Sequence, residues 1–245
     1  MMRFQSRICI KVLLFCYVVS VSAVDDLISL NDFEDFPFKL NDTGVDFGAD
    51  YLGINNVGCN SNITAPQDCH VGRDIDNPDN SDGHAGFNLT KIAADGTELA
   101  ANALTWSCVK DNVTGLIWEV KNDDFSSIHY RYKDFKWGGI GHLGSNYGTY
   151  YDDWDVLVST TNSETLCGKS NWRVPNNDEL LTIIDLGFSG DRLDVNYFPF
   201  IGGIYWTINP WVDFSKACFV RFSTSNALLG FTDRWILNQV MLLSE

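Results

Sequence analysis

Basic side chains are scarce in this sequence. Its 245 residues include 17 lysines and arginines against 32 aspartates and glutamates, which gives a formal net charge of −15 at pH 7. A charge of that sign repels phosphate backbones and anionic lipid surfaces. We therefore expect no nucleic-acid partner, and sulfated glycans are disfavoured as ligands for the same reason.

The motifs of several enzyme and metal-protein classes are missing as well. There is no Cys-x-x-Cys, which disfavours a zinc ribbon or a thioredoxin-type redox site. The four histidines show neither a metal-binding spacing nor a nucleophile motif. Residues 139–144 match the dinucleotide pattern, but no apolar strand precedes them, so we expect no nucleotide cofactor. These absences indicate that the protein is not an enzyme.

Long apolar runs are absent beyond the N-terminus. Residues 1–23 are typical of a signal peptide, with basic residues, an apolar stretch and small residues for cleavage after Ala23. The stretch of about ten apolar residues is too short to cross a membrane, which needs roughly 20. We therefore expect export to the periplasm, the cell surface or the medium, with no membrane span after signal removal.

The remaining composition is that of a globular protein, with 45% hydrophobic and 20% charged residues. Residues 24–103 are rich in Asp, Asn and Gly and are predicted to form an extension of loops and short strands. Seven of the eight tryptophans follow residue 110, so residues 104–245 are predicted to form the main domain. Helices are predicted at 177–186 and 152–162, and strands at 116–120, 204–208, 218–222 and 235–243.

Cysteine usage fits an exported protein. After signal removal five cysteines remain: Cys59, Cys69, Cys108, Cys167 and Cys218. A local disulfide between Cys59 and Cys69 would leave Cys108 and Cys167 to pair, although the sequence alone does not fix the connectivity. The odd number means that one thiol is free or pairs between chains, which leaves a homo-oligomer open. Cys218 lies in an alternating strand-like run and is predicted to be buried.

Two segments carry a family resemblance. Residues 108–119 combine a turn with a strand, and residues 171–180 combine a proline with a capped helix start. Together they resemble the Lcl C-terminal domain family of bacterial surface proteins. The resemblance implies an α+β, C-type-lectin-like fold with small antiparallel sheets, about two helices and long loops. The residues that carry it are Asp111, Thr114, Gly115, Trp118, Trp172, Arg173, Pro175 and Glu179.

These motif residues have chemistry suited to a scaffold. Asp111 and Thr114 can bond backbone groups of a turn in which Gly115 takes a positive φ. Arg173 is expected to pair with Asp111 or Glu179, because a guanidinium held inside a fold needs such partners.

An acidic loop offers a candidate calcium site. Four carboxylates lie within ten residues at Asp74, Asp76, Asp79 and Asp82. Hard oxygen ligands of this kind suit calcium, although the spacing fails the EF-hand rule. The alternative interpretation is a solvated acidic turn.

A ligand-binding surface is predicted at Trp206, Asn209, Trp211 and Asp213. An aromatic ring can pack under the C–H face of a sugar while amide and carboxylate groups bind its hydroxyls. The leading hypothesis is therefore an exported, non-enzymatic module that recognises carbohydrate or another cell-envelope component, such as an envelope protein. The alternatives are a structural subunit of a surface assembly with a calcium-stabilised loop, and an enzyme related to formylglycine-generating folds, whose chemistry Cys218 alone does not supply.

Overall fold

The computed structural model describes most of the chain from residue 40 onward. The described residues are 40–49, 55–57, 67–70, 72–76, 78–138, 153–188, 190–200, 202–223 and 228–245. The predicted signal peptide at 1–23, Cys59 and the glycine-rich segment 139–144 lie outside them. Within the described ranges, no helix has the length and apolar character needed to span a membrane.

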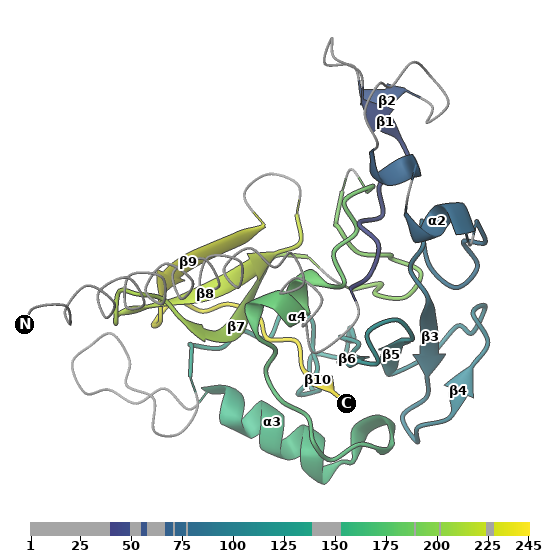
Figure 1. Cartoon of the computed structure of the whole chain (residues 1–245). Coiled ribbons are helices and arrows are strands. Elements are labelled where there is room, and N and C mark those ends of the chain that lie inside the picture. Colours follow the sequence, from purple (N-terminus) through teal and green to yellow (C-terminus); the bar gives the residue numbers. More distant parts are fainter. Residues whose placement is uncertain are drawn as a thin grey trace, which may run out of the picture. The chain divides into compact units, whose positions relative to one another are not determined.

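Two antiparallel sheets organise the described part of the chain (Figure 1). The first, at the right of the figure, has the order β10-β6-β5-β3-β4, and the second, at the left, has the order β7-β8-β9. The first sheet contains β3 (Leu89–Ile92), β4 (Glu98–Leu99), β5 (Cys108–Asp111), β6 (Ile117–Glu119) and β10 (Leu243–Ser244). The second contains β7 (Ile204–Pro210), β8 (Lys216–Arg221) and β9 (Leu229–Asp233). With its few helices, the protein belongs to the predicted α+β class.

The remaining elements are short. β1 (Gly48–Ala49) and β2 (Asn55–Val57) form a separate two-stranded sheet. They are followed by the 3-10 helix η2 (Asp68–His70) and the four-residue helix α2 (Arg73–Asp76). A second 3-10 helix, η3 (Leu166–Gly168), comes after α3 (Asp153–Ser163). The predicted helix at 152–162 is therefore present as α3.

The predicted boundary between residues 103 and 104 falls between two paired strands. β3 precedes this boundary and pairs with β5 along its whole length, from Leu89 opposite Asp111 to Ile92 opposite Cys108. Residues 40–245 form one compact unit. The strand escaped sequence analysis because it is only four residues long and is flanked by Asn, Asp and Gly, which are typical of loops.

The turn between β5 and β6 is closed by a buried carboxylate. Asp111 accepts hydrogen bonds from the backbone N–H of Val113 at 2.9 Å and from Oγ1 of Thr114 at 2.7 Å. Gly115 has a φ of 82°, where an L side chain would be strained. Asn41 also donates to Asp111, so the turn anchors a segment some seventy residues upstream. Burial raises the pKa of Asp111, although its hydrogen bonds oppose that rise.

The helix predicted at 177–186 is shorter than expected. α4 (Asn177–Leu181) begins with a complete capping box between Asn176 and Glu179. Beyond Ile184 the backbone N–H groups bond to other segments, because Asp185 donates to the carbonyl of Arg192 and Leu186 to that of Thr43. The apolar periodicity predicted the buried face correctly, but it did not predict where the helical hydrogen bonds end.

Arg173 takes one of its two expected partners. Its guanidinium binds both carboxylate oxygens of Glu179, at 2.9 and 2.6 Å, and also Glu245 at 2.8 Å. The same Glu179 carboxylate accepts from the backbone N–H of Asn176 in the capping box. After Arg173, the carbonyl of Pro175 accepts from Ile208 of β7. This segment therefore ties the start of α4 to the C-terminus and to the second sheet.

The strand predicted at 235–243 is mostly absent, so this prediction is corrected. Only Leu243 of that range lies in a named strand, β10, while Asn238 and Gln239 form isolated bridges with Phe135 and Tyr205. The four apolar residues 240–243 alternate between two hydrophobic clusters and are fully buried. Residues 240–243 therefore have the composition of a buried strand, which explains the prediction. Their backbone groups nevertheless bond to several segments and not to one neighbouring strand.

The two clusters form the core. One contains Trp118 and Tyr205, and the other contains Trp172 and Trp206. The predicted disulfide between Cys108 and Cys167 is confirmed and lies in the second cluster. Cys69 is also disulfide-bonded. Cys218 is free and buried, as its alternating run predicts.

Candidate functional site

The four residues predicted to bind a ligand do not share one surface. Trp206 is fully buried, and its indole N–H donates to the carbonyl of Phe135 at 2.8 Å, so it is a core residue and this prediction is corrected. Asn209 accepts from the backbone N–H of Asn177 and so holds the start of α4. The start of β7 is buried on both sides, because Tyr205 lies in one hydrophobic cluster and Trp206 in the other.

Trp211 and Asp213 do lie at the surface, in the turn between β7 and β8. The Trp211 ring stacks on Phe231 of β9, with centroids 4.3 Å apart and planes 12° from parallel. Both rings remain exposed, at 38% and 46%. Asp213 accepts from the backbone N–H and hydroxyl of Ser215, and these bonds lower its pKa. We call Trp211 and Phe231 the aromatic pair.

Polar groups border the aromatic pair. Lys216 lies 3.6 Å from a carboxylate oxygen of Asp213, and its ammonium is 5.5 Å from the centre of the Phe231 ring. An aromatic face with a carboxylate and an ammonium at its border can bind a ring that carries hydroxyls. Phe231 was not among the predicted ligand-binding residues, because β9 was not predicted.

The four aspartates predicted to bind calcium are not gathered together. Asp79 instead accepts from the backbone of Ser81, as in a solvated turn. Across the described ranges, no three acidic, His or Cys side chains form a group that could hold a metal ion, and Asp74, Asp76, Asp79 and Asp82 are all within those ranges. Burial and the nearby charge of Asp42 raise the pKa of Asp74. Calcium binding stays a prediction.

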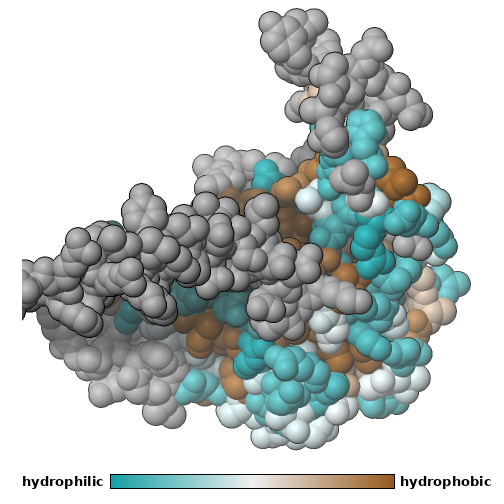
Figure 2. All heavy atoms as spheres, viewed as in Figure 1, coloured by the Kyte–Doolittle hydropathy of each residue, from teal (hydrophilic) through white to brown (hydrophobic). Residues whose placement is uncertain are grey.

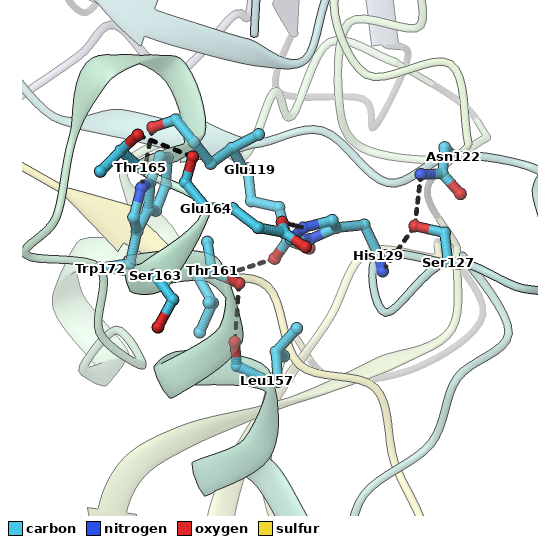
Figure 3. Close-up of polar contacts among 12 residues, drawn as sticks. Glu119, Asn122, Ser127, His129, Leu157, Thr161, Ser163, Glu164, Thr165 and Trp172 are labelled. Atoms are coloured by element: carbon cyan, nitrogen blue, oxygen red, sulfur yellow. Dashed lines mark hydrogen bonds and ion pairs between the residues drawn. The ribbon is translucent and has the colours of Figure 1, made fainter.

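A buried ionic cluster is the main polar feature that the sequence analysis did not find (Figure 3). Oε1 of Glu119 lies 2.7 Å from both Nζ of Lys121 and Nδ1 of His129. Its other oxygen accepts from the backbone N–H of Leu242 at 2.9 Å. Nε2 of His129 lies 3.2 Å from Glu164, which Figure 3 shows reaching toward the imidazole. We call Glu119, Lys121, His129 and Glu164 the ionic cluster.

The ionic cluster shifts the pKa of its members. Burial alone would raise the pKa of Glu119, but the adjacent Lys121 and His129 lower it to about 2. Burial alone would lower the pKa of His129, but its bonds to Glu119 and Glu164 outweigh that effect and raise it. Glu119 is therefore ionised, and the protonated form of His129 is favoured.

A pocket of about 310 Å³ opens beside the ionic cluster. Its lining combines aromatic and aliphatic side chains with the polar groups of Lys121 and His129. The complete lining is Leu104, Thr105, Trp106, Ser107, Val120, Lys121, Asn122, His129, Leu166, Pro199 and Phe200. Trp106 is held in place by a bond from its indole N–H to the carbonyl of Tyr197, with the Lys91 ammonium 3.7 Å from its ring centre. The walls come from segments distant in sequence, so no local motif predicted this pocket.

A match to a known protein family identifies the family of this chain. The model of the Lcl C-terminal domain matches residues 107–236, which is more than half of the chain. The chain belongs to the Lcl C-terminal domain family. The match spans the aromatic pair and most of the pocket lining, whereas β3, β4 and β10 fall outside it. No curated protein and no solved structure shows a significant match.

Membership of the Lcl family indicates a bacterial surface-protein module, and the family is not a known enzyme family. The free thiol of this Lcl domain, Cys218, does not have the properties of a catalytic cysteine. Cys218 is buried, and that burial raises the pKa of the thiol. A nucleophilic cysteine instead needs a lowered pKa and access to substrate.

Replacing His129 in the Lcl domain is expected to destabilise it in a pH-dependent way. The groups that face His129 are Glu119, Lys121 and Glu164. Because the folded protein raises the pKa of His129, its stabilisation is complete below the unfolded value of 6.5 and is lost as pH rises through the folded pKa. His129→Gln should therefore cost about 1.5–3 kcal/mol in acid and less in alkali.

Urea unfolding of wild type and His129→Gln at about pH 5.5 and about pH 8.5 measures this difference. The gap between the two proteins should be larger at the lower pH. A gap that is the same at both values would show that protonation of His129 contributes nothing to stability. Asp185, whose pKa burial raises to about 6, titrates in both proteins and therefore cancels in the comparison.

Proposed function

We propose that this protein is an exported, non-enzymatic recognition module that binds carbohydrate of the cell envelope through Trp211 and Phe231. The observation that carries the proposal is the exposure of two large, stacked rings at the end of the second sheet. Aromatic side chains of that size are normally buried, and rings left in water often mark a binding surface. The proposal includes the C-type-lectin-like fold that the family resemblance implies.

The chemistry of the aromatic pair suits a sugar. The electron-rich face of an indole attracts the polarised C–H groups on one side of a pyranose. Asp213 and Lys216 border the rings and can accept from and donate to sugar hydroxyls. Figure 2 shows that the described surface on the viewed face mixes hydrophilic and hydrophobic areas. A ligand with both a C–H face and hydroxyls fits the stacked rings and the bordering Asp213 and Lys216.

A second candidate function has its own support. Val212 and Phe214, in the same turn as Trp211, are 92% and 75% exposed. A single sugar ring is too small to cover both apolar side chains, whereas an apolar patch on another protein can bury them together. This observation favours the predicted alternative, a structural subunit of a surface assembly.

Trp211→Ala tests the proposed function. The variant should retain the wild-type melting temperature and lose about tenfold or more in affinity for glycans bound by wild type on an array. Phe125→Ala is the matched control, because Phe125 is an exposed aromatic outside both sheets. An array and an envelope pull-down that are both blank with folded wild type would remove the proposal. Capture of a single envelope protein, lost in Phe214→Ala but not in Trp211→Ala, would favour the second candidate.

A further inference from the structure

The pocket beside the ionic cluster has the dimensions and lining of a ligand site. Its volume of about 310 Å³ lies at the lower end of the range for small-molecule pockets, roughly 300–1,000 Å³. One part of its wall is apolar, formed by Trp106, Leu166 and Phe200, and another part carries Lys121 and His129. The pocket shares no residue with the aromatic pair.

Lys121 has hydrogen-bonding capacity to spare. Its side chain is 2% exposed, and an ammonium group carries three N–H donors. Within the described part of the chain, the contact of its Nζ with an acceptor is the one to Oε1 of Glu119. A buried ammonium with unused donors on a pocket wall favours a ligand that brings an acceptor.

The charge balance of the ionic cluster favours an anionic acceptor. The buried carboxylate of Glu119 faces two cationic side chains, Lys121 and His129. The fourth member, Glu164, is 49% exposed and is therefore screened by water. The buried part of the cluster thus carries one positive charge more than negative when His129 is protonated. A second anion in the pocket would balance that charge.

Glu164 indicates which anion fits. It places a carboxylate on Nε2 of His129 at 3.2 Å, longer than the 2.7 Å between Nδ1 and Glu119. Nε2 of His129 therefore has room for a carboxylate, and the one it contacts, that of Glu164, lies at the longer distance. A carboxylate entering from the pocket would compete with Glu164 for His129.

We propose that this pocket binds a small carboxylate attached to an apolar body, with the carboxylate at Lys121 and His129 and the body between Trp106 and Phe200. Two sources share this chemistry, a free organic acid and the C-terminal carboxylate of a peptide. Phenylacetate represents the first and N-acetyl-phenylalanine the second. Their uncharged amides, phenylacetamide and N-acetyl-phenylalaninamide, test the need for the charge.

Calorimetric titration of the purified protein with the four probes gives the first result. At least one acid should bind at millimolar concentration or tighter, and its amide should bind about tenfold more weakly or not at all. The acid that binds more tightly identifies the source. Equal binding of an acid and its amide, or no binding of either acid, would overturn the proposal.

Glu164→Gln gives the second result and does not depend on damaging the pocket. Removing the competing carboxylate should tighten acid binding about threefold or more. Glu98→Gln is the matched control, because it makes the same change in net charge at an exposed ion pair with Lys110. Unchanged affinity in Glu164→Gln, or an equal gain in Glu98→Gln, would overturn the proposal. Phe200→Ala should weaken binding about fivefold through loss of the apolar wall.

Discussion

Glu119→Ala is expected to lower the free energy of unfolding by about 3–5 kcal/mol. The Glu119 side chain is fully buried and binds Lys121, His129 and the backbone N–H of Leu242. Its removal leaves a buried ammonium without its carboxylate and a buried N–H without its acceptor, and each carries a desolvation penalty. Thermal unfolding should show a fall in melting temperature of about 6–20 °C.

Glu98→Ala is the control for Glu119→Ala. Glu98 also pairs with a lysine, Lys110, at 2.9 Å, but its side chain is 61% exposed. An exposed pair contributes about 0–1 kcal/mol, so this variant should unfold close to wild type. If both variants lost the same free energy, the buried position of Glu119 would have no special energetic role.

A triple replacement separates charge from packing in the ionic cluster. Replacing Glu119, Lys121 and His129 together with Leu, Met and Leu removes every buried charge at once while filling similar volume. Such exchanges are often neutral or stabilising, so this variant should recover the part of the stability lost in Glu119→Ala that comes from unpaired charge, while the N–H of Leu242 stays without its acceptor. It should also lose all binding of carboxylates in the pocket. A folded triple variant that still prefers an acid to its amide would contradict the proposed site.

Local sequence predicted the parts of the fold whose bonds are local. The capping box joins Asn176 to Glu179, three residues apart, and the turn at Asp111 is closed by residues two and three positions later. Both pairings depend on residue type and spacing, which a sequence displays directly. The Cys108–Cys167 disulfide is the pairing expected if Cys69 bonds locally, but the sequence alone left the connectivity open.

The ionic cluster could not be predicted, because its partners come from distant segments. Glu119 and Lys121 alternate with Trp118 and Val120, which is the pattern of a strand with one face in water. In the folded protein His129 contacts Glu119, and Glu164, which directly follows α3, contacts His129 in turn. Only tertiary structure shows that these charges are buried. Trp206 was predicted at a surface, but neighbouring residues of β7 are buried on both sides, with Tyr205 in one hydrophobic cluster and Trp206 in the other.

The Cys108–Cys167 disulfide is expected to contribute about 4 kcal/mol to the free energy of unfolding. It joins residues 59 positions apart, and closing a loop of that length restricts the unfolded chain by about this amount. It connects β5 to η3, the segment that follows Glu164 and carries Leu166 of the pocket. Cys108→Ala/Cys167→Ala should therefore unfold at a lower urea concentration and also bind carboxylates more weakly.

Urea unfolding without reductant is the appropriate measurement, because Cys69 is also disulfide-bonded and a reductant would break both crosslinks. Cys218→Ala is the matched control, since it removes a buried sulfur that crosslinks nothing. That control should cost about 1 kcal/mol, close to the loss of a small buried group. A double variant no less stable than Cys218→Ala would show that backbone contacts hold η3 without the crosslink. The bond from the N–H of Cys167 to the carbonyl of Ala94 would then be the contact that positions this side of the pocket.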